Sequence, residues 1–362
     1  MTAVRVGLVG TGGIAGVQAD NLARMGDDVR IAAVMDMNAD AAAAFAQKWG
    51  ADQVVASIDE MIAVHPDVVH LCTPPGVHAE QTIAFLEAGI NVLCEKPVAL
   101  SLAELDRIRA VEERSEASFA AVSQHRFGGR ARWVAERGAA GDLGVPMTAV
   151  CHTLWYRPDA YFEVPWRGTW ASEGGGPTMG HGIHQIDTAL AMLGPWKEVV
   201  AVAARRARDV ETEDLSHAIV TLESGALMSV VNSLLSPREV SYLRLDYQHA
   251  TVELEHLYGY GDDSWTLTPS PSAPAHLEEH WRDSATGQNS GHGAQFSVAY
   301  QALRAGEPMP VTSAQARDTL ELLAAIYASA FERRPVARGE IDDSSPFYRS
   351  MRGSGAPWEH HG

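Results

Sequence analysis

Cysteine is scarce in this chain: the 362 residues include only Cys72, Cys94 and Cys151. No two of them form a CxxC pair, and two lie in apolar segments, where a free cysteine behaves as a small hydrophobic residue. This excludes a small secreted fold held together by disulfides and favours a reducing compartment. The first residues lead directly into an apolar segment, without the charged and hydrophobic regions of a secretory leader, so we expect a cytoplasmic protein.

Long hydrophobic runs and clustered positive charge are also absent. No segment approaches the roughly 18 uninterrupted apolar residues of a membrane helix, so we expect no membrane partner. The 28 Lys and Arg residues are outnumbered by 46 Asp and Glu residues, and the formal net charge is −18. Nucleic acid is therefore not expected as a partner, because phosphate recognition needs clustered Lys and Arg. An anionic small molecule can still bind through backbone N–H groups at the start of a helix.

The first part of the chain alternates short apolar runs with amphipathic stretches. The runs are nearly continuous, as in strands buried on both faces: Val4–Val9, Ile31–Met35, Val68–Cys72, Asn91–Cys94 and Phe119–Val122. Helix signals lie between them, including the capping boxes that begin at Ser57 and Ser101. This alternation predicts an α/β fold, with a Rossmann domain built on a doubly wound parallel sheet over residues 1–124.

The pattern changes after Arg126. A helix is expected at Met179–Leu193, followed by stretches with the period-2 alternation of strands: Val199–Ala204, Ser216–Leu222, Ala226–Leu234 and Val240–Leu257. Ser224-Gly225 predicts a hairpin turn, and two late helices are expected at about Gln295–Arg304 and Ala314–Arg333. We therefore predict an α+β domain over residues 125–362 with a large, mainly antiparallel open sheet. Helices would cover one face of this sheet, and a partner subunit would contact the other.

The first strand leads into a glycine-rich turn, Gly10-Thr11-Gly12-Gly13-Ile14-Ala15, which matches G-x-G-x-x-A. Gly10 permits a tight turn, and Gly12 allows the backbone to approach a pyrophosphate. Asp36 ends the second strand about 20 residues further on, where a carboxylate binds a ribose 2′-OH and repels a 2′-phosphate. We therefore expect NAD rather than NADP, bound by Gly10, Thr11, Gly12, Gly13, Ile14 and Asp36. A glycine-rich turn without a ligand is the alternative, which the agreement of strand, turn, helix and acid disfavours.

Two further segments follow apolar strands: Thr73-Pro74-Pro75-Gly76-Val77-His78 and Glu95-Lys96-Pro97. Ligands of an open α/β sheet bind beyond the carboxyl ends of its strands, so these segments are expected to line the cofactor and reach the substrate. We therefore add Thr73, Pro74, His78, Glu95 and Lys96 to the cofactor-binding residues. Prolines that merely end strands are an alternative for Pro74 and Pro75, but do not explain a Glu-Lys pair directly after a buried strand.

Together these motifs resemble those of the Gfo/Idh/MocA family, named after glucose–fructose oxidoreductase, inositol dehydrogenase and a rhizopine-catabolism protein. The resemblance also rests on Gly174-Gly175-Gly176 leading to Gly182-Ile183-His184-Gln185-Ile186-Asp187, and it covers nearly the whole chain. It implies a Rossmann domain followed by an α/β domain whose open sheet commonly forms oligomer interfaces. It also implies redox chemistry on sugars, polyols and cyclitols with NAD or NADP. By the same resemblance Lys96 and His184 are catalytic, Asp187 binds substrate, and the Lys96–Pro97 peptide is cis.

One position departs from the family pattern. Many dehydrogenases of the family have an aspartate four residues before the histidine, where this chain has Gly180. His181 is adjacent, and we hypothesise that it replaces the missing acid. At helical spacing His181, His184 and Asp187 share one face. A metal site made by these three side chains is an alternative that we disfavour, because no fourth ligand lies nearby in the sequence and the chemistry needs no metal.

Oxidation of a secondary alcohol needs a hydride acceptor, which NAD supplies, and a proton acceptor, for which Lys96 is the candidate. Aromatic and arginine residues concentrate between Trp155 and Trp170, and such side chains stack on sugar rings and bind hydroxyl or carboxylate groups. The substrate-binding candidates are Lys96, Arg126, Tyr156, Arg167, His181, His184 and Asp187. A core aromatic cluster beneath a loop is the alternative for any one residue of this stretch.

The sequence therefore predicts an NAD-dependent oxidoreductase that acts on a sugar, sugar acid or cyclitol. It would assemble as a homo-oligomer, a dimer or tetramer, through the C-terminal sheet. Two other functions stay open. Some relatives cleave glycosides after transient oxidation by tightly held NAD. Because the acid is missing at Gly180, such a hydrolase is an alternative function. A non-catalytic sensor that binds a dinucleotide and a protein partner is the other, and the presence of both Lys96 and His184 argues against it.

Overall fold

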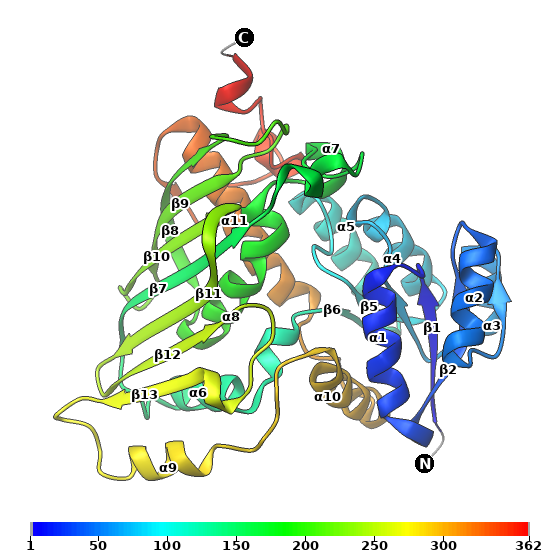
Figure 1. Ribbon diagram of the computed structural model, residues 1–362, viewed down its shortest axis with the longest axis horizontal. Coiled ribbons are helices and arrows are strands. Elements are labelled where there is room, and N and C mark those ends of the chain that lie inside the picture. Colours follow the sequence, from blue (N-terminus) through cyan, green and yellow to red (C-terminus); the bar gives the residue numbers. More distant parts are fainter. Residues whose placement is uncertain (1–2, 361–362) are drawn as a thin grey trace. The chain divides into compact units, whose positions relative to one another are not determined.

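The computed structural model describes residues 3–360 and divides into two compact units. Unit 1 contains the residues up to Ala99 together with Glu104–Val122 and His292–Arg317. Unit 2 contains Leu100–Ala103, Ser123–Gly291 and the residues from Asp318 onward. Figure 1 shows the helices and strands of both units. The expected boundary at residue 124 lies next to the junction between Val122 and Ser123.

Unit 1 is built on a six-stranded, fully parallel sheet in the order β3-β2-β1-β4-β5-β6. The strands are β1 (Val4–Val9), β2 (Val29–Met35), β3 (Val54–Val55), β4 (Val68–Leu71), β5 (Asn91–Cys94) and β6 (Phe119–Ala121). The helices of this part are α1 (Gly13–Arg24), α2 (Ala39–Trp49), α3 (Ile58–Val64), α4 (His78–Glu87), α5 (Leu102–Glu112) and α10 (His292–Ala305). The strand order reverses at β1, so the doubly wound Rossmann sheet predicted from the sequence is confirmed.

Local sequence signals set the ends of these helices. The hydroxyl of Ser57 accepts a hydrogen bond from the N–H of Glu60, whose carboxylate accepts one from the N–H of Ala56, which closes the predicted capping box before α3. Asn38 caps α2, and Gly50 ends it in the left-handed conformation. Strands β1, β4 and β6 are buried at nearly every position, so residues on both faces of the sheet are covered, which explains why these strands read as continuous apolar runs.

The helix α10 clusters with unit 1, although the sequence placed this segment in the second domain. Its residues Phe296, Ala299 and Tyr300 are fully buried in the same core as Val6 and Leu8 of β1. The amphipathic pattern of α10 predicted a helix, but such a pattern does not specify which sheet the apolar face covers.

Unit 2 contains an eight-stranded mixed sheet in the order β13-β12-β11-β7-β10-β9-β8-β14. The strands are β7 (Pro146–Tyr156), β8 (Trp196–Ala204), β9 (Leu215–Leu222), β10 (Leu227–Ser233), β11 (Leu235–Tyr247), β12 (Ala250–His256), β13 (Trp265–Pro269) and β14 (Val336–Ala337). All neighbouring strands run antiparallel except β7 and β10, which are parallel. The predicted large, mainly antiparallel sheet is therefore confirmed, as is the hairpin between β9 and β10.

Two details of this sheet differ from the sequence prediction. The central strand β7 was not predicted, because its buried positions include Thr153 and Cys151 among polar neighbours, which weakens the alternation. The stretch Val240–Leu257 is not one strand but the antiparallel pair β11 and β12, which a short turn connects.

The helices associated with unit 2 are α6 (Gly129–Ala140), α7 (Trp170–Glu173), α8 (Ile183–Leu193), α9 (Leu277–Asp283), α11 (Ser313–Glu332) and α12 (Pro346–Arg349). Helix α8 packs on β7 and β11, and α11 is linked to β8 by a 2.9 Å hydrogen bond from the N–H of Ala201 to Ser329 Oγ. Both helices lie on the same side of the sheet (Figure 1). Residues 3–360 include no helix that is both long and apolar enough to cross a membrane.

Candidate active site

The glycine-rich turn between β1 and α1 leaves open space, an open cradle for a ligand, around the backbone at the start of α1. Gly10 has φ of 91°, and a Cβ at this position would lie 2.8 Å from the backbone carbonyl of Cys72, so only glycine fits. Gly12 is the N-cap of α1, and no side chain caps this helix. A Cβ built at Gly12 or Gly13 meets no atom within 4 Å. The exposed N–H groups of the first turn therefore face space in which a phosphate can bind.

Asp36 lies just beyond the carboxyl end of β2 and contacts the glycine-rich turn. Its Oδ2 accepts hydrogen bonds of 2.8 Å from both the N–H and the hydroxyl of Thr11, and its Oδ1 accepts one of 2.9 Å from the N–H of Asn38. Partial burial raises the pKa of Asp36, but these hydrogen bonds outweigh it and hold the pKa below its usual value. The carboxylate is therefore charged at neutral pH and lies beside the turn, as the fingerprint predicts.

His78 connects the segments that follow β4 and β5. Its Nδ1 lies 2.8 Å from the carbonyl oxygen of Pro97, and its Nε2 lies 2.8 Å from that of Thr73. The side chain is fully buried, and burial lowers its pKa. The structure thus places His78 behind the two segments, where it holds their backbones. The hydroxyl of Thr73 donates to Gln81 Oε1 over 2.7 Å.

Glu95 points into the protein, where it ends a buried chain of polar side chains. Its Oε1 accepts a 2.7 Å hydrogen bond from Gln18 Nε2 and lies 2.9 Å from His292 Nε2. Gln18 Oε1 lies 2.6 Å from His70 Nδ1, and Tyr300 lies 2.7 Å from the other nitrogen of that ring. Burial raises the pKa of Glu95, but His292, Lys96 and Gln18 together lower it below its usual value. These partners were not predicted from the sequence, because they come from three distant elements, α1, β4 and α10.

Lys96 immediately follows the buried carboxylate at the carboxyl end of β5. Its N–H donates a 3.2 Å hydrogen bond to Glu95 Oε2, and the Lys96–Pro97 peptide is cis, as the resemblance implied. In a parallel sheet the carboxyl ends of all strands meet at one edge. Lys96 therefore lies on the same edge of unit 1 as the glycine-rich turn and Asp36.

In unit 2 the predicted histidine segment begins with a π-helical turn, Thr178–Gly182, which continues into α8. Such turns are rare and occur often at functional sites. The buried carboxylate of Glu213 accepts hydrogen bonds from the N–H groups of Gly176 and Thr178 and from the Tyr327 hydroxyl. A Cβ at Gly176 would overlap the carbonyl oxygen of Glu213, which explains the glycines before this turn. A Cβ at Gly180 meets no atom within 4 Å.

Two predicted substrate-binding residues pair with each other. Arg126 Nε and Nη2 donate to the two carboxylate oxygens of Asp187 over 2.6 and 2.5 Å, and Thr319 Oγ1 donates to Asp187 Oδ1 over 2.9 Å. Only 14% of the Arg126 side chain and 6% of the Asp187 side chain are exposed. Both oxygens of Asp187 thus have partners within unit 2. No group of three or more His, Cys, Asp or Glu side chains within residues 3–360 is arranged to hold a metal ion.

His184 lies in a cluster of aromatic rings that the sequence did not predict as a group. The ring of His125 stacks on it with centroids 4.8 Å apart, and the ring of Tyr258 lies at 6.4 Å. Tyr258 also contacts Trp155, whose ring packs edge-on against His181 at 5.0 Å. Tyr258 is 54% exposed and follows β12, about 70 residues along the chain from His184, so only the folded sheet brings them together.

The aromatic and arginine-rich stretch brings a second group toward His181. The guanidinium of Arg167 lies 3.9 Å from the centroid of the Tyr161 ring, which in turn lies 6.3 Å from the His181 ring. Arg167 also donates to the Tyr161 hydroxyl and lies 3.7 Å from Glu173. Tyr156, at the end of β7, is 41% exposed and lies beneath Arg208 instead.

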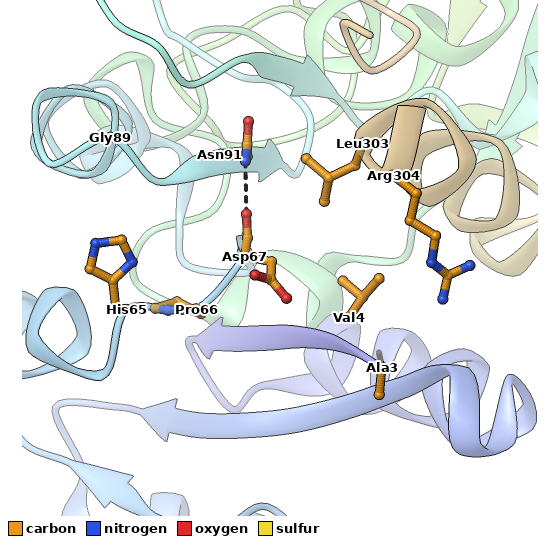
Figure 2. Close-up of a pocket in the computed structure, with 9 residues that line it drawn as sticks. All are labelled: Ala3, Val4, His65, Pro66, Asp67, Gly89, Asn91, Leu303 and Arg304. Carbon is orange, nitrogen blue, oxygen red and sulfur yellow. Dashed lines mark hydrogen bonds between the residues drawn. The ribbon is translucent and has the colours of Figure 1, made fainter. Parts of the chain in front are cut away.

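A separate hollow lies at the amino ends of the strands in unit 1 (Figure 2). His65, Asp67, Asn91 and Arg304 contribute its polar side chains. Asn91 Nδ2 donates to the carbonyl of Asp67 over 2.8 Å, and Arg304 donates to the carbonyl of Asp28. This hollow is at the edge of the sheet opposite Gly10, Asp36 and Lys96. It is therefore not part of the candidate cofactor site.

Models of two protein domains match most of this chain. An oxidoreductase family with an NAD-binding Rossmann fold matches residues 4–122, and the GFO/IDH/MocA C-terminal domain matches residues 131–254. The chain belongs to the Gfo/Idh/MocA family of oxidoreductases. The family resemblance and the expectation of NAD are thereby confirmed. The residues of unit 1 also fit this cofactor, since the open cradle at Gly12 and Gly13 faces an uncapped helix start and Asp36 lies beside it.

Named relatives act on sugars and cyclitols. D-glucoside 3-dehydrogenase of Escherichia coli is 31% identical over 53% of this chain and 54% of its own length. Myo-inositol 2-dehydrogenase of Thermotoga maritima is 29% identical over 64% of this chain and 68% of its own length. The chain thus spans about half to two thirds of these relatives. The WlbA dehydrogenase from Bordetella pertussis, solved with NADH and UDP-GlcNAcA, is 25% identical with a TM-score of 0.83 over 94% of this chain and 100% of that one.

Proposed function

We propose that this protein is an NAD-dependent oxidoreductase that transfers a hydride between nicotinamide and a secondary alcohol or carbonyl of a sugar, sugar acid or cyclitol. The observation that carries this proposal is the position of Lys96. It follows β5 at the carboxyl edge of a sheet whose glycine-rich turn and Asp36 suit NAD. The names of relatives over both domains support the substrate class.

Within this proposal Lys96 is the acid and base that exchanges a proton with the substrate oxygen. NAD, when bound, supplies the hydride acceptor. Lys96 takes the proton from the alcohol oxygen during oxidation and, when protonated, polarises the carbonyl oxygen during reduction. Glu95 places a negative charge one peptide away from Lys96 inside the protein, and His78 holds the loop that contains Pro97. These two residues therefore support Lys96 rather than face the cofactor.

The substrate side of the site is assigned to the surroundings of His184. His184 and His181 are the candidates for proton sharing and for binding hydroxyl groups, with Tyr258 and Arg167 close to them in unit 2. The Arg126–Asp187 pair instead anchors helix α8, because each side chain supplies the opposite charge and the hydrogen-bonding partner of the other. This changes the role expected for these two residues from binding substrate to holding the helix that carries His184.

The test is NADH formation by the purified protein with a panel of sugars, sugar acids and cyclitols, compared with its Lys96→Met variant. We expect one or more compounds to reduce NAD and Lys96→Met to lower kcat by about 10²- to 10⁴-fold, the typical contribution of a positioned acid or base. Lys48→Met changes a surface lysine that lies over Trp49 and serves as the matched control. Cleavage of a glycoside without net NADH formation would identify the hydrolase instead. NADH binding without any turnover would identify the sensor.

We also propose that the open face of the unit 2 sheet forms a homo-oligomer interface. Neighbouring strands place Val200 beside Ile219 and Val202 beside His217 on this face, and Leu227 lies nearby on β10. The apolar side chains among them are 49–65% exposed, which is costly for a surface facing water. Light scattering should show a dimer or tetramer that Ile219→Asp dissociates. Val54→Asp, which adds the same charge at an exposed strand position of unit 1, is the control. A wild-type monomer contradicts this proposal.

A cytoplasmic location is part of the same proposal. Cys72, Cys94 and Cys151 are all free and buried, which supports a reducing environment. Fractionation of the source cells tests this location. Recovery of the protein in the periplasmic or secreted fraction would contradict it.

A further inference from the structure

Behind His184 lies a second imidazole ring, that of His125. The rings of His125 and His184 have centroids 4.8 Å apart and planes only 21° apart, which is a stacked arrangement. His125 belongs to the short helical turn Gln124–Phe127, and His184 belongs to α8. His125 is 4% exposed and His184 is 6% exposed. One face of the His125 ring lies against His184, so His125 is placed to act on the reaction through His184.

The stack continues into the core through three more rings. His256 lies edge-on to His125 at 5.2 Å, and Tyr260 packs against both at 5.3 and 6.0 Å. Trp265 contacts Tyr260 at 5.4 Å and ends the column. The Tyr260 hydroxyl also donates to the backbone carbonyl of His125. The orientation of His125 is thus set from behind by rings on the β12–β13 segment.

His256 is itself locked in one orientation. Its Nε2 lies 2.8 Å from Gln185 Nε2, so the ring nitrogen accepts the hydrogen bond and the ring is neutral. Burial agrees with this, since it lowers the pKa of His256 to about 4. Gln185 follows His184 directly on α8. The residue beside His184 therefore also holds His256, a ring in contact with His125.

A catalytic histidine is commonly oriented by a carboxylate. Here the acid one turn further along α8, Asp187, is occupied by Arg126 and Thr319. A stacked ring fixes a different property: it restricts rotation of the imidazole about its Cβ–Cγ bond, because rotation would break the face-to-face contact. Misplacement of a reacting group by about 1 Å can cost 10²-fold in rate.

We propose that His125 is a positioning residue that holds the plane of the His184 imidazole for catalysis. This inference rests on the proposed function for the role of His184, but not for the geometry itself. Stacking needs a flat ring and not ring nitrogens, so phenylalanine should replace His125 and leucine should not.

The experiment compares His125→Leu, His125→Phe and wild type for kcat and KM on the substrate found by the panel. We expect His125→Leu to lower kcat by about 10- to 100-fold with KM for NAD unchanged, and His125→Phe to restore kcat to within about threefold. His280→Leu, which removes an exposed histidine on α9, is the matched control. Equal loss in His125→Phe and His125→Leu overturns the proposal, because the ring nitrogens would then be required. Full activity of His125→Leu overturns it as well.

A second readout does not depend on turnover. Diethyl pyrocarbonate modifies accessible imidazoles, and mass spectrometry of the peptide that contains His184 measures the rate. We expect His184 to react several-fold faster in His125→Leu than in wild type, and at the wild-type rate in His125→Phe. If His125→Leu does not fold, faster labelling in His125→Phe than in wild type overturns the proposal. Failure of every substrate in the panel would leave this result intact and would count against the proposed function alone.

Discussion

The Arg126–Asp187 pair allows a direct test of whether Asp187 holds the structure or binds substrate. The change is Asp187→Asn, which keeps the shape of the side chain and removes its charge. In the folded protein the carboxylate receives two charge-assisted hydrogen bonds from Arg126 and one from Thr319, all between 2.5 and 2.9 Å. Both side chains of the pair are almost completely buried. Asparagine leaves the guanidinium of Arg126 buried without its hydrogen-bonded counter-charge, and only the charge of Asp318 still acts on it.

The expected loss is large on the scale of protein stability. Removal of one partner from a buried ion pair typically costs about 3–5 kcal/mol, because the remaining charge is desolvated without compensation. The exposed pair of Arg238 and Glu255, whose side chains are 82% and 60% exposed, provides the comparison. Glu255→Gln should change the free energy of unfolding by less than about 1 kcal/mol.

Urea unfolding followed by tryptophan fluorescence measures both variants against wild type. The double variant Asp187→Asn, Arg126→Met should recover part of the loss, since it removes the unpaired charge. The reasoning is refuted if Asp187→Asn lowers the free energy of unfolding by less than about 1 kcal/mol while KM for the substrate rises strongly. Asp187 would then bind substrate, as the family resemblance implied.

Three further predictions concern pH, glycine and cofactor choice. The pKa of His256 is about 4 in the folded protein and 6.5 in the unfolded chain, so this residue should contribute about 3 kcal/mol to the fall in the free energy of unfolding between pH 6.5 and 4, and His256→Gln should remove that contribution. Gly176→Ala should lower the free energy of unfolding by about 1–3 kcal/mol, because its Cβ overlaps the Glu213 carbonyl. Asp36→Ala should raise the ratio of kcat/KM for NADP to that for NAD by about tenfold, since one repulsive charge is removed.

Each of these has a control in the same part of the chain. His280→Gln, which removes an exposed histidine on α9, controls for the loss of one imidazole; equal slopes of the free energy of unfolding against pH for wild type and His256→Gln would contradict the first prediction. Gly180→Ala should leave the thermal unfolding midpoint close to wild type, because a Cβ there meets no atom within 4 Å. A midpoint for Gly176→Ala as high as that of Gly180→Ala would count against the second. Asp40→Ala, an exposed acid near Asp36, controls for net charge in the third, and an unchanged cofactor ratio in Asp36→Ala would contradict it.

The sequence predicted the elements that carry local signals. The glycine-rich turn, Asp36 and Lys96 each follow an apolar strand within a few residues, so a βαβ pattern is sufficient to place them at one edge of a sheet. The capping box at Ser57 and the hairpin at Gly225 are also local, and both are present. Strand β7 and helix α10 were less predictable. The first has an irregular alternation, and the second has an amphipathic face that suits either sheet.

What the sequence determined by itself was the cofactor end of this protein: a Rossmann sheet, an NAD fingerprint and a lysine at the correct edge. Only the tertiary structure decided the roles of the remaining polar residues. It paired Arg126 with Asp187, turned Glu95 inward toward Gln18 and His292, and stacked His125 on His184. The physical reason is the same in each case. A buried polar side chain must find a partner, and such partners lie 60 to 200 residues away in the sequence, where no periodicity or motif connects them.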